Sequence, residues 1–183
     1  MRLRQTSPGR NVPRIWLMTD ERQDEALWSA LARLPRGCGI VFRHYRSPPA
    51  ERRALFDRVR RVARRRKLVL ILADTPGEAA AWRADGVHGR SPHRNPRPLL
   101  RTAPAHDARA LLAARRSGAD LVFLSPVFAT RSHPGARVLG PVRFGLLARR
   151  GGKVAALGGM DGRRARKLAA LGSYGWAGID AFG

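Results

Sequence analysis

Short apolar runs alternate with amphipathic stretches along most of this chain. Three of the runs, at residues 40–42, 68–72 and 121–124, are continuously apolar, which is typical of strands in a parallel sheet covered on both faces. The predicted strands are residues 15–19, 40–42, 68–72, 86–88, 99–103, 121–124, 154–157 and 176–181. The predicted helices are residues 21–34, 48–66, 77–84, 106–117, 140–150 and 161–171.

This order of elements predicts an α/β fold, a small (β/α)8 TIM barrel, with an open doubly wound sheet as the alternative. Three prolines within residues 91–98 exclude a regular helix after the fourth strand, so we expect that helix to be reduced. We also expect no helix after the eighth strand. The predicted organisation is a basic N-terminal arm over residues 1–14 and one barrel domain over residues 15–183.

Polar residues follow the sixth strand, where residues 125–134 read SPVFATRSHP and include Thr130. In a barrel, the loops that follow the strands meet at one face, where functional sites lie. Gly158 and Gly159 follow the seventh strand just before a helix, and residues without a Cβ atom let backbone N–H groups approach a phosphate. The glycine pair predicts a phosphate site, with a simple tight turn as the alternative.

Arginine dominates the charge of the chain. Lysine and arginine number 36 against 13 acidic residues, which gives a net charge of +23. Such a charge suits nucleic acid or other anionic partners. The arginines alternate with alanines on the predicted helices, however, and the basic run at 58–66 contains no aromatic residue for base stacking. Solvated helix faces are the preferred interpretation, and nucleic acid is not the expected partner.

Residue counts and spacing disfavour a disulfide, a zinc site, a serine nucleophile and a membrane span. The single Cys38 excludes an intramolecular disulfide and a CxxC metal motif, which favours a reducing compartment. The histidines lack zinc spacing, and Ser125 lacks the flanking glycines of a nucleophile elbow. No apolar run is long enough for a membrane span. We expect a cytoplasmic protein without a membrane partner, and the oligomeric state, a homo-oligomer included, stays open.

Four stretches together resemble one family. SPVFATRSHP at 125–134 is similar to the block G-P-V-F-x-T-x-x-K-P of the thiamine-phosphate synthase and TenI-type thiazole tautomerase family, and ALGGM at 156–160 is similar to its I-G-G-[IM]. ADGVH at 84–88 and IWLMTD at 15–20 resemble the family's fourth and first strands. The resemblance covers most of the chain from residue 15 onward. It implies a thiamine-biosynthesis barrel, in which the synthase couples hydroxymethylpyrimidine pyrophosphate to a thiazole phosphate with the help of Mg²⁺.

The resemblance also implies roles for individual residues. Arg43 matches the family arginine after the second strand and would be catalytic in a synthase, where Asp74 would be a ligand of Mg²⁺. Thr130, Gly158 and Gly159 match positions that bind the thiazole phosphate. The partners implied are small phosphorylated thiazole and pyrimidine ligands.

Departures from the family pattern gather on the pyrophosphate and metal side. The residues that replace family polar groups are Val41, Tyr45, Ala73, Arg90 to His93, Pro104 and His133. The half that binds the thiazole phosphate is better preserved, so the synthase side is expected to be partly degenerate.

A thiazole tautomerase needs only the preserved half and a group that moves a proton. His106 matches the histidine that such tautomerases use as acid and base, and imidazole titrates near neutrality. Its alternative role is that of a solvated or capping residue in the first turn of a helix. The preferred interpretation is a thiamine-biosynthesis enzyme that binds a thiazole phosphate, either synthase-like with Mg²⁺ or a tautomerase without a cofactor. The alternatives are a non-catalytic ligand-binding relative and a basic nucleic-acid-binding protein.

Overall fold

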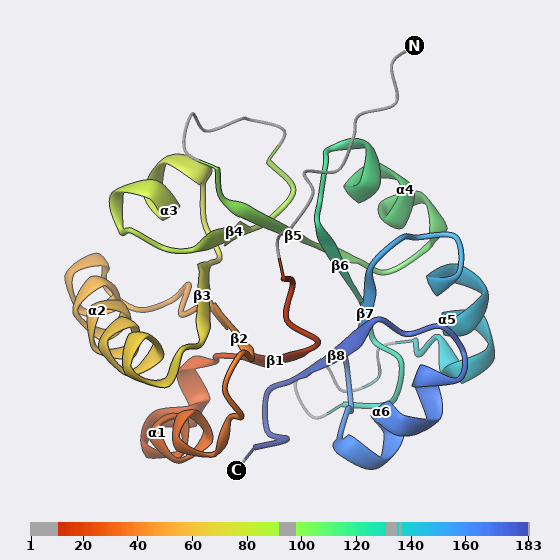
Figure 1. Ribbon diagram of the computed structural model, residues 1–183, viewed down its shortest axis with the longest axis horizontal. Coiled ribbons are helices and arrows are strands. Elements are labelled where there is room, and N and C mark those ends of the chain that lie inside the picture. Colours follow the sequence, from red (N-terminus) through yellow and green to blue (C-terminus); the bar gives the residue numbers. More distant parts are fainter. Residues whose placement is uncertain (1–10, 92–97, 131–134, 136, 183) are drawn as a thin grey trace.

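The eight apolar runs pair in sequence order into a closed parallel barrel, in which β8 returns to β1 (Figure 1). The strands are β1 (Ile15–Met18), β2 (Gly39–Phe42), β3 (Val69–Leu72), β4 (Gly86–His88), β5 (Leu100–Ala105), β6 (Leu121–Leu124), β7 (Val154–Ala156) and β8 (Gly175–Gly178). The helices are η1 (Glu21–Gln23), α1 (Asp24–Arg33), α2 (Pro49–Arg66), α3 (Pro76–Ala81), α4 (Ala108–Arg116), α5 (Gly140–Ala148) and α6 (Gly162–Ala169). The computed structural model describes residues 11–91, 98–130, 135 and 137–182. The predicted small (β/α)8 barrel is confirmed.

Alternating side chains fill the inside of the barrel, because successive residues of a strand point to opposite faces. Trp16 points inward, whereas its neighbour Leu17 belongs to the outer core under the helices. The Trp16 ring meets the Phe123 ring edge to face, with 5.6 Å between centroids. Gly39 makes room for it, since a Cβ atom at that position would lie 2.1 Å from Cε3 of Trp16. The inside of the barrel is therefore a packed core rather than a channel.

Two separate apolar clusters lie between the barrel and its helices. One covers β1 to β4 and includes Phe42, Phe56 and Trp82, whose rings stack edge to face in series. The other covers β5 to β8 and includes Leu124 and Phe144. We call β1 to β4 with their helices the N-terminal half and β5 to β8 with theirs the C-terminal half.

The predicted helix over residues 21–34 is divided into η1 and α1. The Asp20 side chain accepts from the Arg22 N–H, and the Gln23 side chain accepts from the Asp20 N–H at 2.8 Å. Gln23 also donates to the Ile179 carbonyl at 2.8 Å, beyond the end of β8. Asp24, the first residue of α1, has a φ of 34°, which interrupts the helical backbone between η1 and α1. A long-range contact, which the helical pattern does not encode, therefore changes this boundary.

Two strand boundaries also differ from the pattern. β5 continues through Pro104 to Ala105, two residues past its predicted end. β8 ends at Gly178, because the following residues turn back and Phe182 stacks on Trp176 with 5.2 Å between ring centroids. No helix follows β8 among the described residues. The predicted loop after β4 lies largely outside them, at residues 92–97.

Residues just before β1 pack against the barrel. Val12 is buried, and its carbonyl accepts from the Tyr174 hydroxyl at 2.6 Å. The Pro13 carbonyl accepts from the Trp16 indole at 2.7 Å. The last described part of the predicted arm therefore contacts the domain, and residues 1–10 lie outside the described residues. Among the described helices, none is both long and apolar enough to cross a membrane.

Candidate active site

A cavity of about 700 Å³ lies at the carboxyl ends of the strands, mainly in the C-terminal half. Its volume falls within the usual range of small-molecule sites. Its lining residues are Arg43, His106, Ser125, Pro126, Ala129, Thr130, Arg137, Leu157, Gly158, Gly159, Met160, Asp161, Arg164, Gly178, Ile179, Asp180 and Ala181. The loops after β6, β7 and β8 supply most of this wall, which places the cavity where barrels hold their ligands.

The structure brings five of the six candidate residues to this cavity. Arg43, His106, Thr130, Gly158 and Gly159 all line it. The sixth, Asp74, is not among the lining residues, because its carboxylate turns to α2. Residues 131–134 and 136 of the loop after β6 lie outside the described residues.

The Gly158 and Gly159 pair sits directly beneath the loop after β6. Their φ angles are 93° and 59°, in the left-handed region that favours glycine. A Cβ atom on Gly159 would lie 2.3 Å from the Ala129 carbonyl oxygen, and one on Gly158 would lie 2.7 Å from Cα of Pro126. Neither glycine N–H donates to a described backbone carbonyl. Two close-packed loops thus leave backbone donors available beside the cavity.

Charged side chains of α6 flank this glycine pair. Arg164 donates to the Gly159 carbonyl, and its guanidinium lies over the Phe128 ring at 4.8 Å. Asp161 caps the helix by accepting from the Arg164 N–H at 2.8 Å, and this hydrogen bond lowers the pKa of the Asp161 carboxyl. An arginine and an ionised carboxylate therefore both border the predicted phosphate position.

His106 is exposed and held in one ring orientation. It lies before α4 rather than in its first turn as predicted, because Asp107 is the N-cap that accepts from the Ala110 N–H at 2.7 Å. The His106 Nδ1 atom lies 2.9 Å from the Ser125 carbonyl oxygen. A carbonyl only accepts, so Nδ1 carries the proton and, in the neutral ring, Nε2 is a free base. This tautomer suits proton transfer.

Arg43 reaches the cavity from the end of β2. Its Nε donates to the Thr19 carbonyl at 2.6 Å, and its Nη2 donates to Asp20 Oδ2 at 2.9 Å. Burial lowers the pKa of Arg43, and the Asp20 carboxylate opposes that shift. The guanidinium stays charged, because an unperturbed arginine titrates far above neutrality.

Asp74 does not form a metal centre with its neighbours. Its Oδ2 accepts from Arg52 Nη1 at 2.6 Å, and its Oδ1 accepts from the Thr75 N–H at 2.7 Å. Both carboxylate oxygens are thus engaged. The described residues contain no group of three His, Cys, Asp or Glu side chains that could hold a metal ion. The described residues around Asp74 do not fit the Mg²⁺ that the family resemblance implies.

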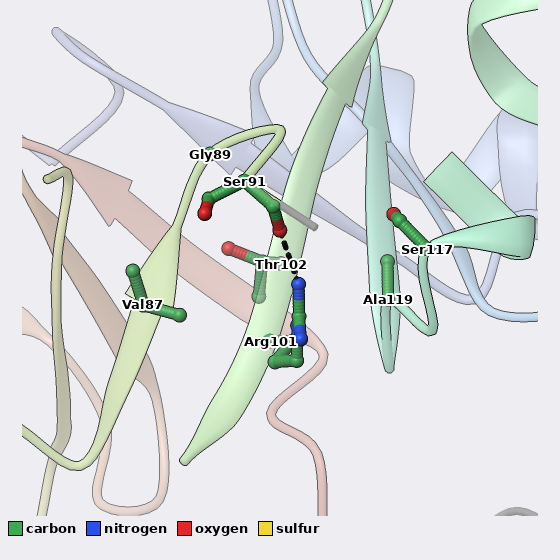
Figure 2. A pocket seen from close by; sticks show the side chains of 7 residues that line it. All are labelled: Val87, Gly89, Ser91, Arg101, Thr102, Ser117 and Ala119. Carbon is green, nitrogen blue, oxygen red and sulfur yellow. Dashed lines mark hydrogen bonds between the residues drawn. The ribbon is translucent and has the colours of Figure 1, made fainter. Parts of the chain in front are cut away.

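A second, water-sized hollow of about 10 Å³ lies beside β4 and β5 (Figure 2). Arg101 and Thr102 of β5 both line it, and Arg101 donates to the Ser91 carbonyl. Thr102 Oγ1 lies 2.9 Å from Nδ1 of His88, and burial lowers the pKa of His88 to about 4. His88 is therefore neutral near pH 7, and its ring packs against Phe123 at 5.7 Å between centroids.

Sequence reasoning missed several residues of the site. Ser125 is not a nucleophile candidate, yet its carbonyl orients His106. The predicted eighth strand wrongly includes residues 179–181, which follow β8 and form part of the cavity wall. Arg164 could have been predicted from one feature of the sequence. It follows the N-cap Asp161 by three residues, which places it in the first turn of α6.

Comparisons with known proteins agree on one family. A family model described as thiamine monophosphate synthase matches residues 15–182. A curated protein of Aquifex aeolicus (strain VF5), named "Putative thiamine-phosphate synthase 2", is 28% identical over 183 residues, which cover 93% of this chain and 98% of that protein. The thiamine phosphate pyrophosphorylase structure from Pyrococcus furiosus has a TM-score of 0.75 at 25% identity, covering 92% of this chain and 86% of that one. A structure titled "QR15, an Aldolase" shares the fold alone, with a TM-score of 0.62 at 12% identity over 92% of this chain and 91% of that one.

Proposed function

Because the chain belongs to the thiamine monophosphate synthase family, we propose that it binds a thiazole phosphate in the cavity of the C-terminal half and moves a proton within that ligand. One observation carries the proposal. The cavity joins the Gly158 and Gly159 pair and Thr130 to an oriented His106, whereas Asp74 is committed to Arg52. These contacts support binding of a thiazole phosphate better than they support binding of a metal ion at Asp74.

The phosphate of the ligand would bind at the glycine pair. Backbone N–H groups near a helix N-terminus are favourable donors to an anion, and Arg164 and Arg43 add positive charge at the same cavity. Thr130 supplies a hydroxyl from the loop after β6. The thiazole ring would then lie toward His106.

His106 would act as both base and acid. With Nδ1–H donated to the Ser125 carbonyl, Nε2 accepts a proton from one position of the thiazole ligand and returns it to another, so no atom is gained or lost. Such a reaction needs no cofactor. The small phosphorylated ligand is the only partner proposed, and a cytoplasmic location fits this role.

A synthase-like coupling of pyrimidine pyrophosphate to thiazole phosphate is the second candidate. Arg43 at the cavity favours it, as do the names of the relatives. Against it, the engaged carboxylate oxygens of Asp74 leave the described residues without a metal centre for the leaving pyrophosphate.

NMR assays of purified protein test the two reactions. With a thiazole phosphate tautomer as substrate, we expect turnover without Mg²⁺, and His106→Gln should lower the rate about 10²- to 10⁴-fold with an unchanged melting temperature. Ser125→Ala is the matched control, since it keeps the orienting carbonyl and removes only an Oγ atom 3.3 Å from Nδ1. Full activity of His106→Gln would contradict the proposed role. Mg²⁺-dependent coupling that Asp74→Ala abolishes would establish the second candidate instead.

A further inference from the structure

Arg52 of α2 joins the ends of β2 and β3. Its Nη1 donates to Asp74 at 2.6 Å, its Nη2 to the Ala73 carbonyl at 3.0 Å, and its Nε to the Arg43 carbonyl at 3.1 Å. The side chain is only 11% exposed, and its guanidinium lies over the Trp82 ring at 5.3 Å. Three nitrogens of one buried cation are thus fixed by three acceptors on two strand ends.

The acceptors around this guanidinium are one carboxylate oxygen and two carbonyl oxygens. Oxygen donors of these kinds are also the ligands that a hard divalent cation takes. An arginine is charged at every accessible pH and presents its donors in a rigid fork. A metal ion bound to Asp74 would need this oxygen-lined position. The guanidinium of Arg52 occupies it with a permanent positive charge.

The same contacts lead toward the cavity. Arg52 holds the backbone carbonyl of Arg43, and the Arg43 side chain crosses to Thr19 and Asp20 at the end of β1. The Asp20 N–H donates to Gln23, which donates in turn to the carbonyl of Ile179 in the cavity wall. A continuous series of hydrogen bonds thus connects Arg52 with the residues that line the cavity.

We propose that Arg52 is a built-in cation that takes the place of a divalent metal ion at Asp74 and positions Arg43 at the cavity. The guanidinium neutralises the carboxylate and fixes the backbone from which Arg43 meets an anionic ligand. Ligand binding then needs no added metal. The identity of the anion rests on the proposed function, whereas the exclusion of metal from Asp74 does not.

Mn²⁺ binding, followed by electron paramagnetic resonance, tests the first part. Wild type should bind no more Mn²⁺ than Asp74→Asn does. Arg52→Ala should gain at least about tenfold in Mn²⁺ affinity, because three oxygens lose their cation, and adding Asp74→Asn should remove the gain. The proposal would be overturned if wild type bound submillimolar Mn²⁺ and Asp74→Asn abolished that binding. It would also be overturned if Arg52→Ala bound Mn²⁺ no more tightly than wild type does.

Isothermal titration with thiazole phosphate and with inorganic phosphate tests the second part. Arg52→Ala should weaken binding about tenfold, and Arg52→Lys, which keeps the charge but not the three-way fork, should weaken it less. Arg53→Ala is the matched control, since Arg53 also lies over Trp82 but pairs with Asp57 on its own helix.

Thermal melting checks that each variant is folded, and Arg52→Lys decides if Arg52→Ala does not fold. Unchanged phosphate affinity in a folded Arg52 variant would overturn the positioning role. If wild type bound no thiazole phosphate, the proposed function would fail. The titration with inorganic phosphate and the Mn²⁺ experiment would still test the role of Arg52.

Discussion

The two halves of the barrel differ at the carboxyl ends of their strands. At the ends of β1 to β3, the charged groups pair with one another, as Asp20 does with Arg43 at 2.9 Å and Asp74 does with Arg52 at 2.6 Å. At the ends of β6 to β8, the loops instead surround a cavity of about 700 Å³. The same barrel therefore has paired charges at one set of strand ends and an open cavity at the other.

The largest expected effect is at the glycine pair of the open half. Gly159→Ala places a Cβ atom 2.3 Å from the Ala129 carbonyl at a φ of 59°, so backbone strain and overlap add. We expect a loss of about 3 kcal/mol in the free energy of unfolding and more than tenfold weaker binding of thiazole phosphate. Urea unfolding and titration calorimetry measure the two effects.

Gly152→Ala is the control for that substitution. Gly152 has a similar φ of 75° but nothing within 4 Å of its built Cβ atom. Its free energy of unfolding should fall by only about 1–2 kcal/mol, and its affinity for thiazole phosphate should not change. Equal behaviour of the two variants would mean that close packing of the loops does not shape the cavity.

A second prediction concerns His88, a buried histidine of the N-terminal half. Burial, aided by the charge of Arg43, lowers the pKa of His88 to about 4, while His106 is exposed. The unfolded chain takes up a proton at His88 near pH 6.5 and the folded chain does not, so stability falls as pH falls from 6.5 toward 4. Between pH 7.5 and pH 5 this contribution amounts to about 2 kcal/mol.

Urea unfolding of wild type and of His88→Gln at both pH values measures this contribution. His88→Gln should lose this part of the pH dependence, although its absolute stability also changes through lost packing on Phe123. An unchanged slope in His88→Gln would show that His88 is protonated in the folded protein.

The smallest expected effect concerns the carboxylate beside the glycine pair. Asp161→Asn keeps an N-cap acceptor for α6 and removes a negative charge from the cavity wall. Thiazole phosphate should bind about two- to threefold more tightly, as expected for one exposed charge. Titration at low and high salt checks this, and weaker binding in Asp161→Asn would place the phosphate elsewhere.

The apolar pattern predicted the barrel well because its elements are set locally. Continuous runs such as residues 121–124 form strands, and capping residues such as Asp161 begin helices close to the predicted positions. Boundaries failed where distant groups intervene. Gln23 ends η1 while bonded to Ile179, and Phe182 turns back onto Trp176. No local pattern encodes these contacts.

The candidate site was predicted where residues follow strands, because all such loops meet at one face. Arg43, Thr130 and the glycine pair share the cavity for that reason. The pairing of Asp74 with Arg52 could not be predicted, since Arg52 is one of many arginines on α2 and only the fold brings it to β3. An aspartate that resembles a metal ligand in sequence is therefore a partner of arginine in space.

Titration calorimetry of thiazole phosphate into wild-type protein, with EDTA and then with Mg²⁺, tests the central claim most directly. We expect one bound ligand per chain, with the same affinity in EDTA and in Mg²⁺, and the same affinity for Asp74→Asn. The absence of heat at millimolar ligand would contradict the proposed function, as would binding that requires Mg²⁺ and is lost in Asp74→Asn.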